Sequence, residues 1–521
     1  MEYSQFQKDI FNWVQNGSGN AVVRAVAGSG KTTTLIESLN LITKNKRVCL
    51  LAFNKSIAEE LKRRTPTHIN VQTFHSLGWS VMRMHLNNPV LDDNKVYNHI
   101  KTFFKQKRIS FKDFSQKIKI SNNIKKIIDF LRLNLVEIPS SLDIHQICLN
   151  QDIEILDNEI SLSLQLYSGI IEDDSCYDFV DMLFIPVFRK LKFPKFDWVF
   201  TDECQDASII QQKMMELCIA EGGRFMAVGD PSQSLYAFAG ADANAYENFT
   251  NQPNTIQLPL SICYRCGSSI IKEAQKLVPE IQHWDKNGVG QIVENGSIKN
   301  VKDGDVVLCR VNFPLAALAG NFLRENKKVS ILGSDFGKNL SKLIESCKGT
   351  STAELFSFLA KKLQKIYDEI VQENSFVDPN TQPEYQLMLD KINTIRALSE
   401  NCENIKEVLA KIQTIFSDSI DKTGILLSTV HKFKGRESEN VYIIEPQLIP
   451  FPYYLHLPNQ AKTENNIKYV AITRAKNKLE YIRDWTAYTK DETKRKSRPK
   501  NKLRNKSHLP LQDEDEGHDH G

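Results

Sequence analysis

Two short segments carry residues whose types and spacing suit the binding and cleavage of a nucleoside triphosphate. Residues 25–33 read Ala-Val-Ala-Gly-Ser-Gly-Lys-Thr-Thr, and Thr-Asp-Glu-Cys-Gln-Asp follows at 201–206. In the first segment, Gly28 and Gly30 permit a tight turn whose backbone N–H groups face inward and cradle phosphate oxygens. Position 25 is Ala where the general phosphate-loop pattern has Gly. The interpretation therefore depends on the elements on either side of the loop.

Those elements are a strand and a helix. Residues 21–26 form a short β-branched apolar run, which is typical of a buried parallel strand. Residues 32–39 are predicted to form a helix, whose positive N-terminal end would face the phosphates. Lys31 would reach the β- and γ-phosphates, and Thr32 would ligate Mg²⁺. Because all three elements are present, a nucleotide site is favoured over a Gly-Ser loop beside a solvated lysine; its loop residues would be Ala27, Gly28, Ser29, Gly30, Lys31, Thr32 and Thr33.

The acidic pair of the second segment follows another strand pattern. The apolar run at 196–200 delivers Asp202 and Glu203 to its C-terminal end, where α/β sheets bind ligands. Asp202 would hold Mg²⁺, and Glu203 would polarise the attacking water. Adjacent carboxylates on a loop are usually only solvated. Their place at a strand end, downstream of a phosphate loop, favours the catalytic interpretation.

Composition limits the class of protein. With 521 residues, 41% hydrophobic and 25% charged, the chain should form two to four globular domains. We expect no membrane span, no secretion signal and a cytoplasmic location. Ten scattered cysteines suit a reducing compartment, and the one C-x-x-C pair, Cys263 and Cys266, is interpreted as structural rather than zinc-binding. A net charge of +4 does not by itself indicate nucleic acid, so a local basic groove would be needed.

The chain divides into alternating α/β and helical stretches. Strand and helix patterns alternate near the N-terminus and again after residue 262, which predicts an α/β fold with two parallel sheets. Helical spacing, as in Ile124, Ile127, Ile128 and Leu131, predicts an insertion in each α/β region. The charged tail is expected to be disordered, either merely solvated or adding nonspecific phosphate affinity. The predicted divisions are 1–85 plus 191–261, 86–190, 262–336 plus 422–488, 337–421 and 489–521.

Further blocks occur in a fixed order along the chain. Together with the two segments above, they make the chain resemble the superfamily 1A DNA helicases of the UvrD/Rep/PcrA type, most closely the compact members similar to F-box DNA helicases. The resemblance spans residues 4 to about 483. The blocks are Ser-Gln-Phe-Gln (4–7), Ala-Phe-Asn-Lys-Ser (52–56), Thr-Phe-His-Ser (73–76), Gly-Asp-Pro-Ser-Gln-Ser-Leu-Tyr-Ala-Phe (229–238), Cys-Tyr-Arg (263–265), Thr-Val-His-Lys-Phe-Lys-Gly-Arg-Glu (429–437) and Tyr-Val-Ala-Ile-Thr-Arg-Ala (469–475).

The resemblance assigns further residues to the nucleotide. Gln7 would read the adenine edge, Tyr264 would stack on adenine, and Glu437 would bind the ribose. Gln233 would contact the γ-phosphate, while Arg265 and Arg474 would act as two arginine fingers. Two guanidinium groups stabilise the charge that spreads over the γ-phosphoryl oxygens in the transition state. The cofactors implied are ATP and Mg²⁺.

The resemblance also assigns residues to DNA. Single-strand binding needs aromatic stacking faces and hydrogen-bond donors to phosphate. The family commonly has Trp where Phe238 stands, and Phe still stacks, though over less area. It commonly has Arg where Ala239 stands, and the missing Arg puts in question one contact that couples hydrolysis to movement. The predicted DNA-binding residues are Phe53, Asn54, Thr73, Phe74, His75, Tyr236, Phe238, Thr429 and His431.

The implied protein has two RecA-like domains that share one ATP at their junction. The resemblance implies a 3′-to-5′ helicase acting on single-stranded DNA and single-strand/duplex junctions, with one nucleotide moved per ATP. A translocase or DNA-end sensor that works in a complex without unwinding is the alternative. A nucleotide-gated binding subunit is a third interpretation, disfavoured by Glu203, Arg265 and Arg474. A protein partner from a repair, replication or defence complex is compatible with the sequence, and no membrane partner is expected.

Overall fold

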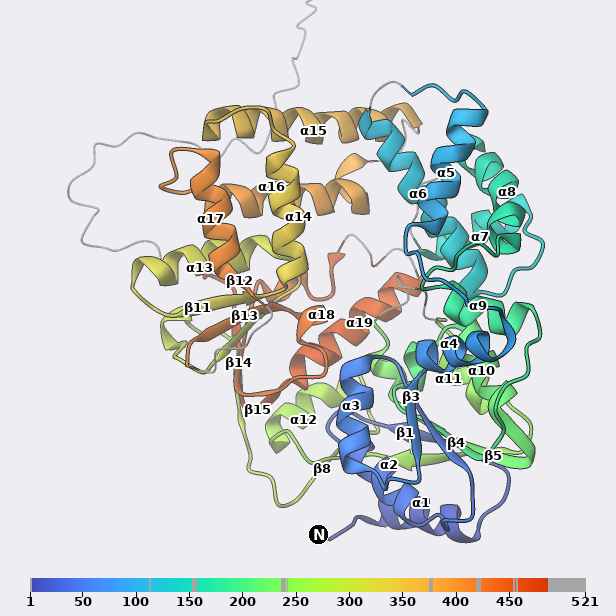
Figure 1. Cartoon of the computed structure of the whole chain (residues 1–521). Helices are drawn as coiled ribbons and strands as arrows, with labels where there is room; N and C mark the ends of the chain where they lie inside the picture. Colours follow the sequence, from blue (N-terminus) through green and yellow to red (C-terminus); the bar gives the residue numbers. More distant parts are fainter. Residues whose placement is uncertain are drawn as a thin grey trace, which may run out of the picture.

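The computed structural model describes residues 2–111, 114–151, 157–235, 240, 242–373, 378–417, 423–452, 455 and 458–485. The charged tail predicted at 489–521 lies outside these residues. Two lobes lie side by side, each built on a sheet and extended by helices at the same end of the molecule (Figure 1). The strand pairs of both sheets are parallel, which confirms the predicted α/β class.

The first lobe contains a six-stranded sheet in the order β3-β2-β4-β5-β1-β6. Helices on its two faces bury alternate residues of each strand: Val22 of β1 faces one core, whereas Ala21 and Val23 face the other. The strands are β1 (Asn20–Ala25), β2 (Val48–Ala52), β3 (Asn70–Thr73), β4 (Phe196–Thr201), β5 (Ile219–Gly229) and β6 (Thr255–Leu260). The helices are α1 (Gln5–Asn16), α2 (Lys31–Asn40), α3 (Lys55–Arg64), α4 (Phe74–His85), α9 (Asp181–Phe188), α10 (Ile209–Cys218) and α11 (Ala245–Thr250).

A helical insertion rises from this lobe. It consists of α5 (Lys95–Gln106), α6 (Phe114–Leu133), α7 (Ser141–Gln151) and α8 (Asp157–Glu172). The predicted apolar face of α6 is confirmed, because Ile124, Ile127, Ile128 and Leu131 are all fully buried. The insertion shares one continuous hydrophobic core with the sheet, and α9 packs against α4 and α10 although the predicted boundary at residue 190 places it in the insertion.

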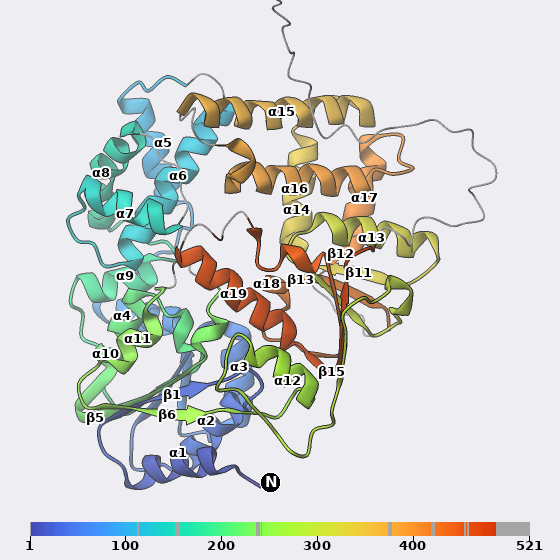
Figure 2. The ribbon, with the colours of Figure 1, turned by 180° about the vertical axis from the view of Figure 1, so that it is seen from behind.

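The second lobe contains a seven-stranded sheet in the order β12-β11-β13-β10-β14-β15-β9. Its strands are β9 (Gln291–Val293), β10 (Val306–Cys309), β11 (Val329–Leu332), β12 (Phe416–Ser417), β13 (Ile425–Thr429), β14 (Ser438–Ile444) and β15 (Ala475–Ile482). Two short strands that precede β9 in the chain, β7 (Ile262–Cys263) and β8 (Gln282–His283), form a separate two-stranded sheet. The associated helices are α12 (Ser268–Gln275), α13 (Phe313–Arg324), α18 (Val430–Phe433) and α19 (Pro458–Ile472). Both views show α19 crossing the middle of the molecule between the lobes (Figures 1 and 2).

The second insertion comprises α14 (Ser334–Glu345), α15 (Thr352–Glu373), α16 (Pro383–Leu398) and α17 (Ile405–Ile415). Strand β12 falls inside 337–421, the range predicted to be a mostly helical insertion, and joins the sheet next to β11. Short 3₁₀ turns complete the described elements: η1 (Cys204–Asp206), η2 (Pro231–Gln233), η4 (Ile298–Asn300), η5 (Pro379–Thr381) and η6 (Pro446–Leu448).

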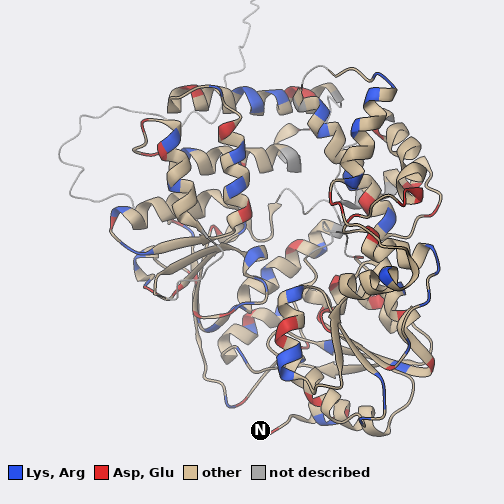
Figure 3. Cartoon of the chain, in the orientation of Figure 1, with Lys and Arg blue, Asp and Glu red and all other residues tan. Residues whose placement is uncertain are grey.

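The charged residues are spread over both lobes (Figure 3), and the cysteines form no disulfide bonds. Basic and acidic residues are interleaved on both lobes (Figure 3). The ten cysteines are free, and Cys263 and Cys266 are both fully buried. Within the described part of the chain, no group of three or more His, Cys, Asp or Glu side chains is placed to hold a metal ion by itself, and no helix combines the length and apolar character needed to cross a membrane.

Candidate nucleotide and nucleic-acid site

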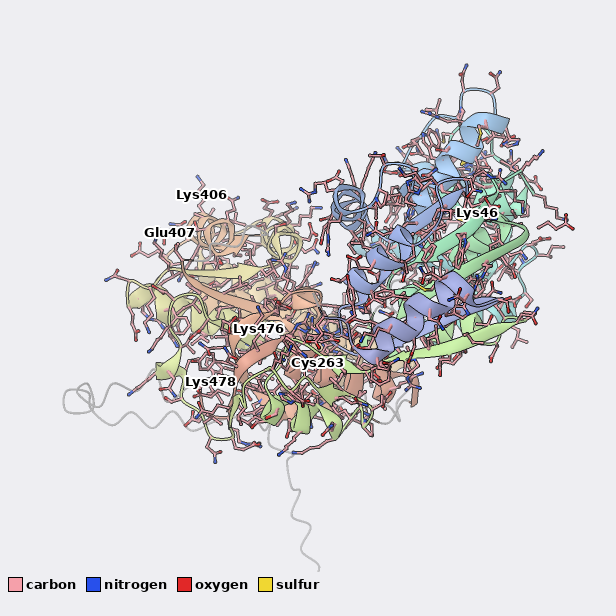
Figure 4. All side chains as sticks on the ribbon, turned by 90° about the horizontal axis from the view of Figure 1, so that it is seen from below. Lys46, Cys263, Lys406, Glu407, Lys476 and Lys478 are labelled. Atoms are coloured by element: carbon pink, nitrogen blue, oxygen red, sulfur yellow. The ribbon has the colours of Figure 1, made fainter. Side chains whose placement is uncertain are left out.

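A cleft of about 1010 Å³ opens between the two lobes and takes its walls from both. The first lobe contributes the phosphate loop (28–33) with Glu203, Asp206 and Gln233, and the second contributes Arg265, Lys434, Glu437 and Arg474. Cys263, the last residue of β7 and two residues before Arg265, lies where the lobes meet (Figure 4). The cleft between the lobes, here called the seam, is therefore lined by side chains from segments up to about 440 residues apart in the chain.

The phosphate loop has the backbone that its glycines predict. Gly28 and Gly30 adopt positive φ angles of 67° and 78°, and α2 begins at Lys31 without a side-chain cap. Its first N–H groups are therefore available to an anion. A Cβ at Gly28 would lie 2.7 Å from the Cβ of Arg265, so a glycine is needed where the second lobe approaches the loop. The buried hydroxyl of Ser29 has no hydrogen-bond partner in the structure, as expected for a group that awaits a phosphate oxygen.

The proposed magnesium ligands lie next to each other. The Thr32 hydroxyl donates to the Asp202 carboxylate over 3.2 Å, and Asp202 follows β4 directly. Burial and the neighbouring Glu203 charge raise the pKa of Asp202 to about 6. A buried carboxylate with excess negative charge around it favours a cation, and oxygen ligands are those that Mg²⁺ prefers. The pair therefore fits a Mg²⁺ ion.

Glu203 occupies a strained position at the start of η1. Its φ and ψ of 51° and 38° lie in the left-handed region, which costs free energy for a residue with a side chain. Burial would raise the pKa of Glu203, but the charges of Lys31 and Lys434 lower it to about 2. The carboxylate is therefore ionised at neutral pH, as a group that orients an attacking water must be.

The groups predicted to bind ATP are paired with one another in the structure. Lys31 contacts Glu203 over 2.9 Å, Arg474 donates to Gln233 over 3.2 Å, and Arg265 donates to Glu437 over 2.5 Å. Burial opposes the charge of Lys31, but the carboxylates of Glu203, Asp202 and Asp230 raise its pKa, so the ammonium group stays charged. Binding of a nucleotide at the predicted positions would exchange each internal contact for one with the ligand.

The predicted adenine end joins three elements. Gln7 closes a capping box with Ser4 at the start of α1 and donates to Thr34 of α2 over 3.1 Å. The hydroxyl of Tyr264 donates to the same Gln7 amide over 3.3 Å, across the two lobes. Trp284 packs edge-on against Tyr264 at 5.2 Å between ring centroids. Sequence reasoning did not select Trp284, because a lone aromatic outside any motif gives no signal.

The sequence of this chain is similar to those of known helicases. Residues 6–254 match the UvrD/REP helicase N-terminal domain. The chain is 24% identical over 485 residues to the ATP-dependent DNA helicase Rep of Buchnera aphidicola subsp. Baizongia pistaciae, covering 85% of this chain and 68% of that protein. It is 22% identical over 613 residues to PcrA of Staphylococcus aureus MRSA252, covering 89% and 81%. Over residues 6–254 the chain belongs to the UvrD-type superfamily 1A helicases, and its likeness to Rep and PcrA extends over most of its length.

A fungal relative is also similar to this UvrD-type chain. The F-box DNA helicase protein 1 of Schizosaccharomyces pombe is 23% identical over 520 residues, which cover 91% of this chain but 56% of that protein. The chain therefore corresponds to little more than half of the fungal relative's length. The likeness to F-box helicases that the sequence motifs suggested agrees with this match.

In this UvrD-type chain the cleft continues past the phosphate loop onto an aromatic surface. Phe53, Asn54 and His75 line it, together with Phe179. The rings of His75 and Phe179 stack at 4.0 Å, and burial lowers the pKa of His75 to about 4, which leaves its ring neutral at pH 7. The surface thus offers rings without a histidine charge, which suits stacking on bases rather than ionic contact with phosphate.

The other residues predicted to contact DNA are buried, cap helices, do not line the cleft or lie outside the described part of the chain. Phe74 is 1% exposed and packs against Phe53 in the core, so its predicted DNA contact is corrected to a structural role. Thr73 and Asn54 cap α4 and α3 with their side chains, and Thr429, the residue at the N-cap of α18, is largely buried. His431, two residues further, is not among the residues that line the cleft. Tyr236 and Phe238 lie outside the described residues.

Phe179 is a second aromatic residue, after Trp284, that sequence reasoning missed. Its ring is 55% exposed, yet in the sequence it stands just before an apolar stretch and looks like a core residue. A buried ion cluster fixes its neighbours: Arg132 contacts Asp178 and Asp181 over 2.8 Å each, and Lys95 contacts Asp181 over 2.9 Å. This cluster ties α5 and α6 to the segment that presents Phe179.

Replacing Phe179 by Ala is expected to weaken single-stranded DNA binding by about 1–3 kcal/mol, the usual contribution of one stacked base. The measurement is titration of a fluorescent oligonucleotide by fluorescence anisotropy. Phe114→Ala is the matched control, because Phe114 is 75% exposed and does not line the cleft. Equal affinity in the two variants would contradict a DNA role for Phe179.

Proposed function

We propose that this protein is an ATP-dependent DNA helicase that moves 3′ to 5′ along single-stranded DNA and opens duplexes at single-strand/duplex junctions. The observation that carries the proposal is the shared cleft, in which Lys31 and Glu203 of one lobe face Arg265 and Arg474 of the other. Such a site is complete only when the lobes approach each other. ATP binding would close the seam, and product release would open it.

The second part of the proposal is the coupling of this cycle to movement. The aromatic surface around Phe53 and Phe179 continues the same cleft, so one opening and closing motion alters both ligand sites. Each lobe would hold the strand in turn, and every cycle of hydrolysis would advance the protein along it. The names of the Rep and PcrA relatives, which describe ATP-dependent DNA helicases, support this activity. ATP and Mg²⁺ are the proposed cofactors.

A translocase or end sensor that does not unwind alone is the second candidate. The small second insertion, α14 to α17, favours it, because little structure is then available to engage a duplex ahead of the motor. In this case a protein partner would supply the missing duplex contacts.

Two assays separate these candidates. ATP turnover is measured with and without a single-stranded oligonucleotide, and we expect a several-fold rise with DNA. Strand displacement is then measured on duplexes with a 3′ tail, a 5′ tail or no tail, and opening of the 3′-tailed substrate alone is expected. DNA-stimulated hydrolysis without displacement would favour the translocase. Tight binding with negligible turnover would refute both and indicate a nucleotide-gated binding subunit.

A further inference from the structure

Three side chains of helix α19 and of the turn after it contact the phosphate loop or the segment around η2 in the first lobe, and Lys462 of the same helix pairs with Glu247 over 3.7 Å. The Asn466 amide donates to the carbonyl oxygens of Pro231 and Ser234, over 3.3 and 3.0 Å. One turn later, the Tyr469 hydroxyl accepts a hydrogen bond from the Ala27 N–H over 3.0 Å. Arg474 then reaches Gln233. Residues three or four apart lie on one face of a helix, so a single face of the second lobe contacts the first.

The contacts of those three side chains belong to two functional segments. Ala27 is the first residue of the phosphate loop, whereas Pro231 and Ser234 bracket η2 in the segment 229–238, here called the coupling segment. That segment carries Gln233, which is predicted to contact the γ-phosphate, and leads to the predicted DNA-binding residue Tyr236. A rigid helix therefore connects the start of the nucleotide site with the segment between the nucleotide and DNA sites.

The chemistry at Asn466 is specific. Its side chain is 9% exposed, and two carbonyl oxygens face the same nitrogen. Carbonyl groups only accept hydrogen bonds, so the position requires a donor with two hydrogens, which the amide supplies. A carboxylate of the same shape would set lone pairs against both carbonyls. Asn465, the preceding residue on the helix, is exposed and has no such constraint.

Building on the proposed function, we propose that Asn466 and Tyr469 are positioning residues through which α19 transmits the nucleotide state of the phosphate loop to the coupling segment. Through its hydrogen bond with the Ala27 N–H, Tyr469 would shift when the phosphate loop shifts. Through its hydrogen bonds to Pro231 and Ser234, Asn466 would then set the position of the backbone at 231–234. Because Tyr469 is fully buried, a shift of the loop moves the helix rather than the side chain alone. Neither residue touches the reacting atoms, so their loss should affect coupling more than basal hydrolysis.

The first test compares Asn466→Asp with Asn465→Asp in the full-length chain. Loss of two hydrogen bonds should reduce the DNA-stimulated turnover number about tenfold, while basal turnover and the KM for ATP stay within a few-fold of wild type. Asn465→Asp adds the same charge on the same helix and should change neither rate. Equal loss of basal and stimulated turnover, or no loss at all, would overturn the proposal.

The second test needs no DNA. Hydrogen exchange of the peptide covering 231–235 is measured with and without a non-hydrolysable ATP analogue. The nucleotide-dependent change should be present in wild type, and it should be lost in Asn466→Asp and in Tyr469→Phe, which keeps the buried ring. Tyr442→Phe is the control, because its hydroxyl donates within the second lobe, to the Asn300 carbonyl. A change that persists in both variants would overturn the proposal, even if wild type shows no DNA stimulation and the proposed function itself fails.

Discussion

Replacing Lys31 by Ala is expected to reduce ATP turnover by about 10²–10³-fold or more, the cost of losing a preorganised electrostatic group at the transition state. The Lys31 ammonium lies at the start of α2, 2.9 Å from Glu203, and is the cation of the phosphate loop. No other part of the loop supplies a charge that follows the γ-phosphoryl group. Turnover is measured at saturating ATP and Mg²⁺, with and without single-stranded DNA.

Single-stranded DNA binding by Lys31→Ala should remain measurable, because the aromatic surface around Phe53 and Phe179 is built by other segments of the cleft. Lys46→Ala is the matched control: Lys46 is an exposed lysine of the same lobe, apart from the seam (Figure 4). It should leave turnover unchanged. A Lys31→Ala protein that hydrolyses ATP at the wild-type rate would refute the assignment of the nucleotide site.

The fold was predictable wherever a local pattern decides the structure. The helix predicted at 32–39 is observed as α2 (Lys31–Asn40), and α3 likewise has local signals, because Asn54 caps its start and the chain reaches Pro66 soon after its end. Domain boundaries were less accessible. Strand β12 has only two residues and forms through pairing with β11, which no local propensity encodes. Likewise α9 is assigned to the first lobe by its packing, not by its sequence.

At the site, too, the features set by local sequence were predictable and those set by tertiary packing were not. Side chains next to a loop or strand end, such as Lys31, Thr32 and Asp202, meet as predicted from the order of strand, loop and helix. Burial at the seam could not be read from sequence. Phe74 and Phe179 are both phenylalanines beside apolar residues, yet one is 1% exposed and the other 55%. The difference arises from the way the helical insertion joins the lobe, which is a tertiary property.

Contacts between the two lobes are a further group that the sequence could not predict. Asp206 and Lys434 pair over 2.6 Å although neither was selected, and Asn466 has no motif signature beyond its neighbours. Burial raises the pKa of Asp206 to about 6 despite the lysine, so the pair lies in a poorly solvated seam. Such contacts depend on the relative placement of two domains, which is set by the sum of many weak interactions rather than by one motif.

Replacing Arg474 by Lys is expected to lower the turnover number by about 10³-fold, the lower end of the contribution of an arginine finger. Arg474 is 1% exposed, and burial together with the Arg265 charge lowers its pKa to about 10, so it remains charged at neutral pH. Its guanidinium donates to Val470, Arg436 and Gln233 at once, which fixes a planar fork at the seam. Lysine keeps the charge but cannot hold that geometry.

The Arg474→Lys variant distinguishes an effect on ATP turnover from an effect on ATP affinity. ATP affinity, measured with a fluorescent analogue, should change only a few-fold, because the phosphate loop still grips the nucleotide from the other lobe. Arg483→Lys is the control, since Arg483 is exposed at the end of β15 in the same domain. Unchanged turnover in Arg474→Lys would mean that the charge alone suffices and that the fork does not act on the γ-phosphoryl group. A parallel loss of affinity and turnover would instead assign Arg474 to ground-state binding, because a group that acts only in the transition state lowers the rate without weakening the complex.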